Sequence, residues 1–166
     1  MSLSPIGPEE LRQQRERLYQ EMPAEVSALE RRRGVMQPAG PLLYAEAESR
    51  LLHEQLSLLV LAVEAEQLDL ERAIPSLRFL LDRAAVRLGG WYLLHDAADL
   101  VARVSVSIES LDSAARLALL RELVYYVGRL NYWLDLTIPW NDVNELMRAT
   151  SGANVTLDSG EEVARG

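Results

Sequence analysis

The 166-residue chain contains no cysteine, and this absence excludes several kinds of chemistry. Without thiols there is no disulfide, no thiolate-bound zinc, no iron–sulfur cluster and no cysteine nucleophile. The longest unbroken apolar run covers six residues, 58–63, whereas a membrane-spanning helix needs about 20. The first residues lack the basic start and the apolar stretch of a secretory signal. The sequence therefore predicts a cytoplasmic protein without a membrane partner.

Lysine is absent too, so all 17 basic residues are arginines, against 25 aspartates and glutamates. The net charge of −8 would repel a phosphate backbone, and the one basic run, residues 31–33, is preceded by Glu25 and Glu30. Nucleic-acid binding is therefore not expected. Without lysine the Gly-x-x-x-x-Gly-Lys phosphate loop cannot occur, and the glycine-rich dinucleotide pattern and the Gly-x-Ser-x-Gly nucleophile pattern are missing as well. No cofactor is expected.

Helical periodicity dominates the residues that are present, of which 49% are hydrophobic and 25% charged. Apolar side chains recur at spacings of four, three and four from Leu52 to Val63, which predicts a helix from Leu42 to about Gln67. Because residues 58–63 are apolar all round, we expect the C-terminal half of this helix to lie at the centre of a bundle.

Two further helices are predicted beyond this one. The spacing of apolar residues from Leu70 to Leu88 predicts a helix that Pro75 starts or bends, and that Gly89 and Gly90 end in the left-handed conformation. A second long helix, capped by Asp112 or Ser113 and ending near residue 137, carries two apolar faces and is expected to be central.

The stretch from Trp91 to Glu109 carries two conflicting patterns. Residues 104–108 alternate between apolar and polar with the period of a strand, whereas Ala97, Val101, Val104 and Ile108 fit one face of a helix. No other segment alternates, so a strand here would lack a partner. We therefore expect a helix.

The N-terminal region is expected to be a helical arm. Pro8, followed by two glutamates, is typical of a helix start, and the pattern continues to about residue 33 with a kink or break at Pro23. Its apolar stripe, which includes Leu18 and Met22, is narrow. We expect it to dock on the core by that stripe or to pair with a second copy, without forming part of the core.

Together these segments predict an all-α fold, a helical bundle of about five principal helices with an extended N-terminal arm. The arm covers residues 1–33 and the core bundle residues 42–149, within a single domain of residues 1–149. We expect that core to include a short helix over 141–149, and residues 150–166 to form a flexible acidic tail.

The two histidines permit a sketch of a metal site. His95 shares a helix face with Asp99 and precedes Asp96, and with His53 and Asp135 from other helices it would give two imidazoles and carboxylates. Such a set resembles the HD-type metal phosphohydrolases in three or four residues, and implies a metal-dependent hydrolase. The bland alternative places the histidines on solvated faces, because no surrounding motif accompanies them.

The most informative local composition is an aromatic cluster near the end of the last long helix. Tyr125, Arg129 and Tyr132 share an otherwise polar face, and these are residue types that protein interfaces favour. They either form an interface, together with Leu18 and Met22 of the arm, or pack on the arm within one chain.

The sequence therefore favours a non-enzymatic interaction subunit (an adaptor, assembly factor or chaperone-like protein) that acts on a protein partner and forms a homodimer. Two alternatives stay open beside it. One is the metal-dependent hydrolase, and the other is a bundle that binds a small ligand in a pocket lined by Trp91, Tyr126 and Trp133.

Overall fold

A computed structural model of the chain describes residues 4–31, 39–90 and 94–137, and these residues form five α-helices and no strand. The helices are α1 (Pro8–Arg31), α2 (Ala39–Glu64), α3 (Leu70–Leu88), α4 (His95–Ile108) and α5 (Ser113–Thr137). The predicted all-α fold is confirmed. The expected helix over 141–149 and the tail over 150–166 lie outside the described residues.

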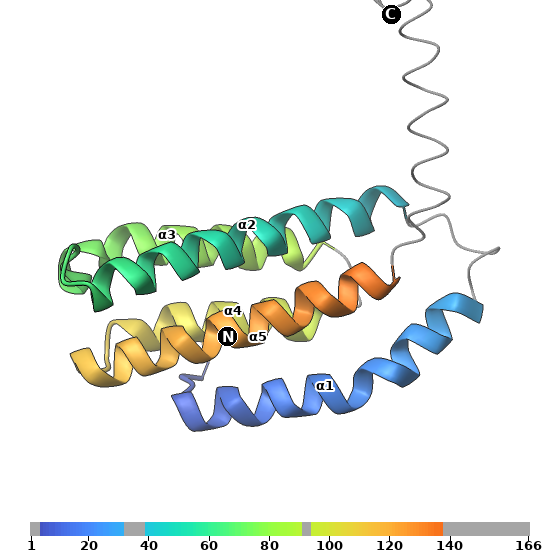
Figure 1. Cartoon of the computed structure of the whole chain (residues 1–166), viewed down its shortest axis with the longest axis horizontal. Helices are drawn as coiled ribbons and strands as arrows, with labels where there is room; N and C mark the ends of the chain where they lie inside the picture. The colour runs from blue at the N-terminus through green and yellow to red at the C-terminus, as the bar shows by residue number, and fades with distance from the viewer. Residues whose placement is uncertain (1–3, 32–38, 91–93, 138–166) are drawn as a thin grey trace, which may run out of the picture.

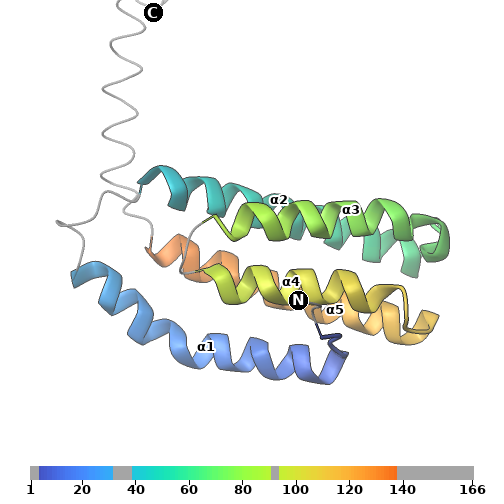
Figure 2. The same ribbon diagram turned by 180° about the vertical axis from the view of Figure 1, so that it is seen from behind.

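Helices α2 to α5 form an antiparallel four-helix bundle (Figure 1). Each packs against the next along the chain, and α5 closes the bundle by packing against α2. The α2–α3 pair lies on one side of the α4–α5 pair, and α1 lies on the other side, along α5 (Figure 2). Short connections between antiparallel neighbours are the usual way for amphipathic helices to bury their stripes together.

The region with conflicting patterns is helical, as expected, from His95 to Ile108. Val104 and Ile108 lie one helical turn apart and are buried in the core. The strand-like alternation comes from Ser105 and Ser107, which are buried as well. Their polar hydroxyl groups are tolerated in the core because each accepts a hydrogen bond. The Ser107 hydroxyl accepts from the backbone N–H of Ile6 at 2.6 Å, and that of Ser105 accepts from Arg78 Nε at 3.4 Å.

Helix α5 has an N-cap that the sequence predicts, whereas the backbone conformation at the end of α3 differs from the prediction. The Asp112 carboxylate accepts a hydrogen bond from the N–H of Ala115 at 2.8 Å, so Asp112 caps α5. Helix α3 does end at Leu88, but Gly89 has φ −67° and ψ −7°, which is right-handed rather than left-handed. Glycine fits there for a different reason. A Cβ at this position would lie 3.2 Å from the Ala85 carbonyl oxygen and 3.5 Å from the Ala98 Cβ of α4.

Pro75 neither starts nor ends α3, since the helix begins at Leu70, where Asp69 caps it by accepting from the N–H of Glu71 at 3.1 Å. Pro23 likewise lies inside α1 without ending it, although the helix curves along its length (Figure 1).

Two expectations about burial need correction. The C-terminal half of α2 is not central, because Leu58 and Leu61 are both more than half exposed. Within the described residues, helix α2 packs mainly against α3 and α5, and Leu58 and Leu61 lie on a side of it that faces solvent. The N-terminal helix does lie outside the bundle, but its stripe belongs to the core, since Leu11 and Met22 are buried. Helix α5, by contrast, packs against α1, α2 and α4 and is central as predicted.

Candidate functional site

The residues sketched as metal ligands are not gathered into a site. His95, Asp96 and Asp99 lie exposed on the first turns of α4. His53 lies on α2 against α5, where a Cβ at Gly128 would be 3.4 Å from its Nε2. The Asp135 carboxylate is paired with Arg50 at 3.0 Å. Within residues 4–31, 39–90 and 94–137, no group of three or more histidine, aspartate or glutamate side chains could hold a metal ion.

The tyrosine and arginine residues of α5 lie beside α1, which partly covers them. The Arg15 guanidinium of α1 lies 5.2 Å from the ring centre of Tyr125, and the Arg129 guanidinium lies 4.5 Å from the ring centre of Tyr19 on α1. Arg15 is also paired with Glu122 at 3.1 Å. These cation–π contacts are the intramolecular packing that the sequence left open.

The same face nevertheless keeps much of its aromatic surface in solvent. Tyr125 is 55% exposed and Tyr132 is 56% exposed. Leu18 is half-buried and Met22 is buried beneath α1, so Met22 would reach another chain only if α1 moved. The role of these residues as an interface stays a prediction.

A second apolar surface lies on the opposite side of the molecule. Leu58 and Leu61 on α2, and Phe79 and Val86 on α3, point away from the core and are 60%, 62%, 69% and 78% exposed. We call these four residues the α2–α3 outer face. Single exposed apolar residues are ordinary, but exposed apolar surface concentrated on two adjacent helices is a feature of binding surfaces.

A shallow groove of about 570 Å³ runs between the two helices of this face. Leu59, Leu77 and Leu80 contribute apolar lining, and Phe79 stands at its edge. Arg83 also lines it, and the buried Nε of Arg83 finds no hydrogen-bond acceptor in the part of the chain that the structure describes. Burying an arginine N–H without an acceptor costs free energy. The groove therefore contains a donor whose hydrogen bond is not made within the described part of the chain.

Phe79 and Val86 were not predicted as surface residues of interest, although their spacing in the sequence carries a signal. They lie seven residues apart on α3, on the side opposite the buried stripe that contains Leu77, Leu81 and Ala84. Large apolar residues on the non-core side of an amphipathic helix are the sequence signature of a second contact surface.

A third feature is a groove of about 510 Å³ between α1 and α4, with α5 as its floor. Tyr126 and Trp133 line it, as the predicted small-ligand pocket required, while Trp91 lies outside the described residues.

Comparison with known proteins provides no relative. The chain matches no model of a protein family, and searches of curated proteins and of solved structures find no significant match. Among the described helices, none combines the length and apolarity needed to cross a membrane.

Proposed function

We propose that the protein is a non-enzymatic helical interaction subunit that forms a homodimer through the α2–α3 outer face. The observation that supports this most directly is the exposure of four large apolar side chains there, each more than half in solvent. Removing this surface from water on association would supply the hydrophobic driving force. A second copy is the occupant that the size and the charges of the face favour.

The size of the face suits a dimer. Helix α3 has 19 residues, which gives it a length of roughly 28 Å at about 1.5 Å per residue. Two adjacent helices present a width of roughly 20 Å, since axes of packed helices lie about 8–10 Å apart. The footprint is thus several hundred Å², the same order as the roughly 800 Å² that each partner contributes to a standard interface.

The charges on the face are complementary to themselves. Arg72 and Arg83 are accompanied on the same two helices by the exposed acids Glu54 and Asp82. In a two-fold symmetric dimer the same patch meets itself, so an arginine of one copy can meet a carboxylate of the other. Such a contact would give the Arg83 Nε the acceptor that it lacks within the described part of one chain.

The test is the mass of the full chain in solution, measured by sedimentation equilibrium over a range of concentrations. We expect a reversible dimer, and we expect F79E combined with V86E to weaken it at least about ten-fold, because two charges would be buried in an apolar contact. Both residues are exposed in the monomer, so helicity measured by circular dichroism should stay unchanged.

The matched control is Y125A combined with Y132A, which removes exposed aromatic surface from the other side of the molecule. It should leave the dimer intact. A wild-type chain that remains monomeric at high concentration would overturn the proposal. So would a dimer that the tyrosine variant dissociates and the F79E/V86E variant does not, since the interface would then lie on the α1–α5 side.

A further inference from the structure

The groove between α1 and α4 has an apolar floor and a charged rim. Leu18 and Met22 of α1, Leu100 of α4, and Tyr126 and Trp133 of α5 supply apolar and aromatic lining. Its volume of about 510 Å³ falls within the range of roughly 300–1,000 Å³ typical of small-molecule sites. It lies on the side of the α4–α5 pair away from the α2–α3 outer face.

The positive charges around the groove are already bound by the chain itself. Arg17 donates to the Glu21 carboxylate at 2.8 Å. Arg103 donates to the Glu10 carboxylate at 2.9 Å and to the backbone oxygens of Ser4 and Pro5 at 2.9 and 3.2 Å. Each guanidinium therefore already has a carboxylate partner, and the charge of Asp96 also acts on Arg17.

The negative charges of the rim are different. Asp96 and Asp99 both line the groove from α4, and neither forms an ion pair with a side chain in the described part of the molecule. The rim is therefore acidic. A place at the start of a helix explains part of this, since carboxylates suit that end of the helix dipole. The helix dipole does not account for the Tyr126 hydroxyl in the floor of the groove.

The floor contains a polar atom without a protein partner. Tyr126 is only 3% exposed and lines the groove, and no hydrogen bond of its hydroxyl is found among the described residues. Burial raises the pKa of this tyrosine, and the negative charges of Asp96 and Glu21 raise it further. The hydroxyl thus lies in the negative field of the rim and faces the groove, where water or a ligand can hydrogen-bond to it.

We infer that this groove binds a small organic cation, an ammonium or guanidinium group carried on an apolar stem. The cationic group lies between Asp96 and Asp99, where its charge is balanced. The stem lies on the apolar lining near Leu18 and Leu100, and the aromatic side chains of Tyr126 and Trp133 favour a cation nearby. The Tyr126 hydroxyl completes the site as a hydrogen-bonding group.

The experiment is calorimetric titration of the full chain at low salt with benzylammonium, which combines an apolar stem with a positively charged group that can donate a hydrogen bond to the Tyr126 hydroxyl. We expect one site per chain with a Kd below about 1 mM. Benzyl alcohol and benzenesulfonate, which are neutral and anionic, should bind at least about ten-fold more weakly, because only the cation gains from the carboxylates. Equal affinities for the three probes would overturn the inference. So would the absence of cation binding at a concentration about ten times the expected upper limit of the Kd.

Variants locate the site. D96N combined with D99N should reduce the affinity for the cation about ten-fold or more, and Y126F a few-fold. D82N, which neutralises an exposed acid on α3 outside the groove, is the matched control and should change nothing. An unchanged affinity in D96N/D99N would refute the assignment. If Y126F failed to fold, the aspartate pair, which is exposed, would still decide the question.

This site is independent of the proposed dimer. The F79E/V86E variant changes only the opposite side of the molecule, so it should bind the cation as the wild-type chain does. Failure of the dimer and failure of the groove are thereby distinguishable in the same set of proteins.

Discussion

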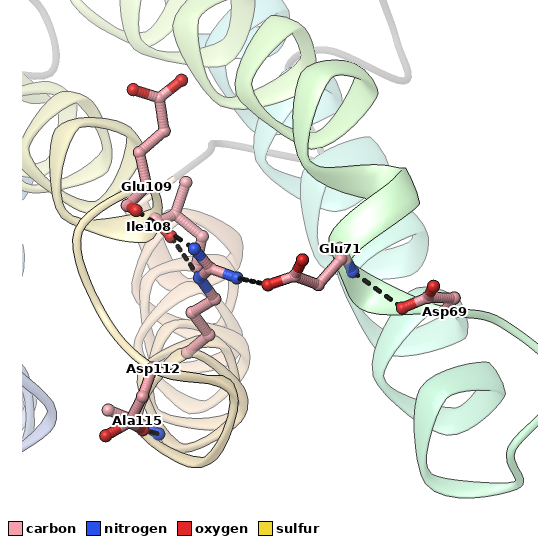
Figure 3. A network of polar contacts seen from close by, with 7 residues as sticks. Asp69, Glu71, Ile108, Glu109, Asp112 and Ala115 are labelled. Atoms are coloured by element: carbon pink, nitrogen blue, oxygen red, sulfur yellow. Dashed lines mark hydrogen bonds and ion pairs between the residues drawn. The ribbon is translucent and has the colours of Figure 1, made fainter.

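Arg116 connects three helices through one guanidinium group. From α5 it donates to the backbone carbonyl oxygens of Ile108 and Glu109 at 2.6 and 3.0 Å, and to the Glu71 carboxylate of α3 at 2.8 Å (Figure 3). Helix α4 has no basic residue in its last turn, so Arg116 supplies the donors that its C-terminal end requires. A short side chain at this position would leave buried carbonyl groups without donors.

We expect R116A to lower the free energy of unfolding by about 2–3 kcal/mol, since it orphans two carbonyl groups and one charge-assisted contact. Urea unfolding followed by circular dichroism measures this. The matched control is R72A, whose guanidinium is exposed and lies 4.0 Å from Asp69. That variant should cost less than about 0.5 kcal/mol. Equal losses for the two variants would show that the network at Arg116 contributes little.

Tyr126 predicts an alkaline limit to stability. Burial raises the pKa of its phenol in the folded chain above the ordinary value of 10.0. Above that pH the unfolded chain loses the proton and the folded chain keeps it, so the free energy of unfolding falls as the pH rises. The contribution is fully present below pH 10 and is lost above it.

The variant Y126F removes this ionisation. Between pH 10 and 11 the wild-type free energy of unfolding should therefore fall more steeply than that of Y126F, by up to about 1.4 kcal/mol per pH unit. Urea unfolding at pH 9, 10 and 11 measures both slopes. Y132F, at a tyrosine that is more than half exposed, is the control. Parallel slopes for wild type and Y126F would contradict the assignment.

At the scale of the elements, α1 is the part whose role the structure changes most. It lies outside the four-helix bundle, yet Leu11 and Met22 belong to the same core cluster as the bundle residues. We expect L11A to destabilise the whole chain by about 2–4 kcal/mol, as for other buried leucines, in one cooperative transition. Q13A, on the exposed side of α1, is the control. A separate early transition confined to part of the helical signal would show instead that α1 unfolds by itself.

Much of the element order followed from the sequence, because each helix carries its own apolar period, and Asp69 and Asp112 cap α3 and α5. The arrangement did not follow. Both α2 and α5 carry more apolar residues than one stripe needs, and periodicity alone predicts that both are central. Among the described helices, α5 packs closely against α1, α2 and α4, whereas α2 packs mainly against α3 and α5 and leaves Leu58 and Leu61 in solvent. Burial of this kind depends on which helices meet, and no single helix contains that information.

The candidate sites likewise depend on which helices meet, so the sequence predicted only the parts that lie within one helix. The aromatic residues Tyr126 and Trp133 lie seven residues apart, on one face of α5, so their common face was predictable. The groove beside them also needs Asp96 and Asp99 from α4 and Leu18 from α1, and its existence depends on how α1 lies along α5. Conversely, His53 and His95 are chemically suited to a metal, but the described fold gathers no ligand set around them.

For the whole molecule, the net charge of −8 has a consequence for association. Two copies repel one another over the Debye length, which is about 30 Å at 0.01 M salt and about 10 Å at 0.1 M. The apolar contact proposed for the α2–α3 outer face is not screened by salt. We therefore expect the dimer to tighten several-fold as salt rises from 0.01 to 0.15 M, measured by sedimentation equilibrium. An interface dominated by ion pairs would weaken over the same range, so a Kd that rises with salt would remove the apolar face as the source of the affinity.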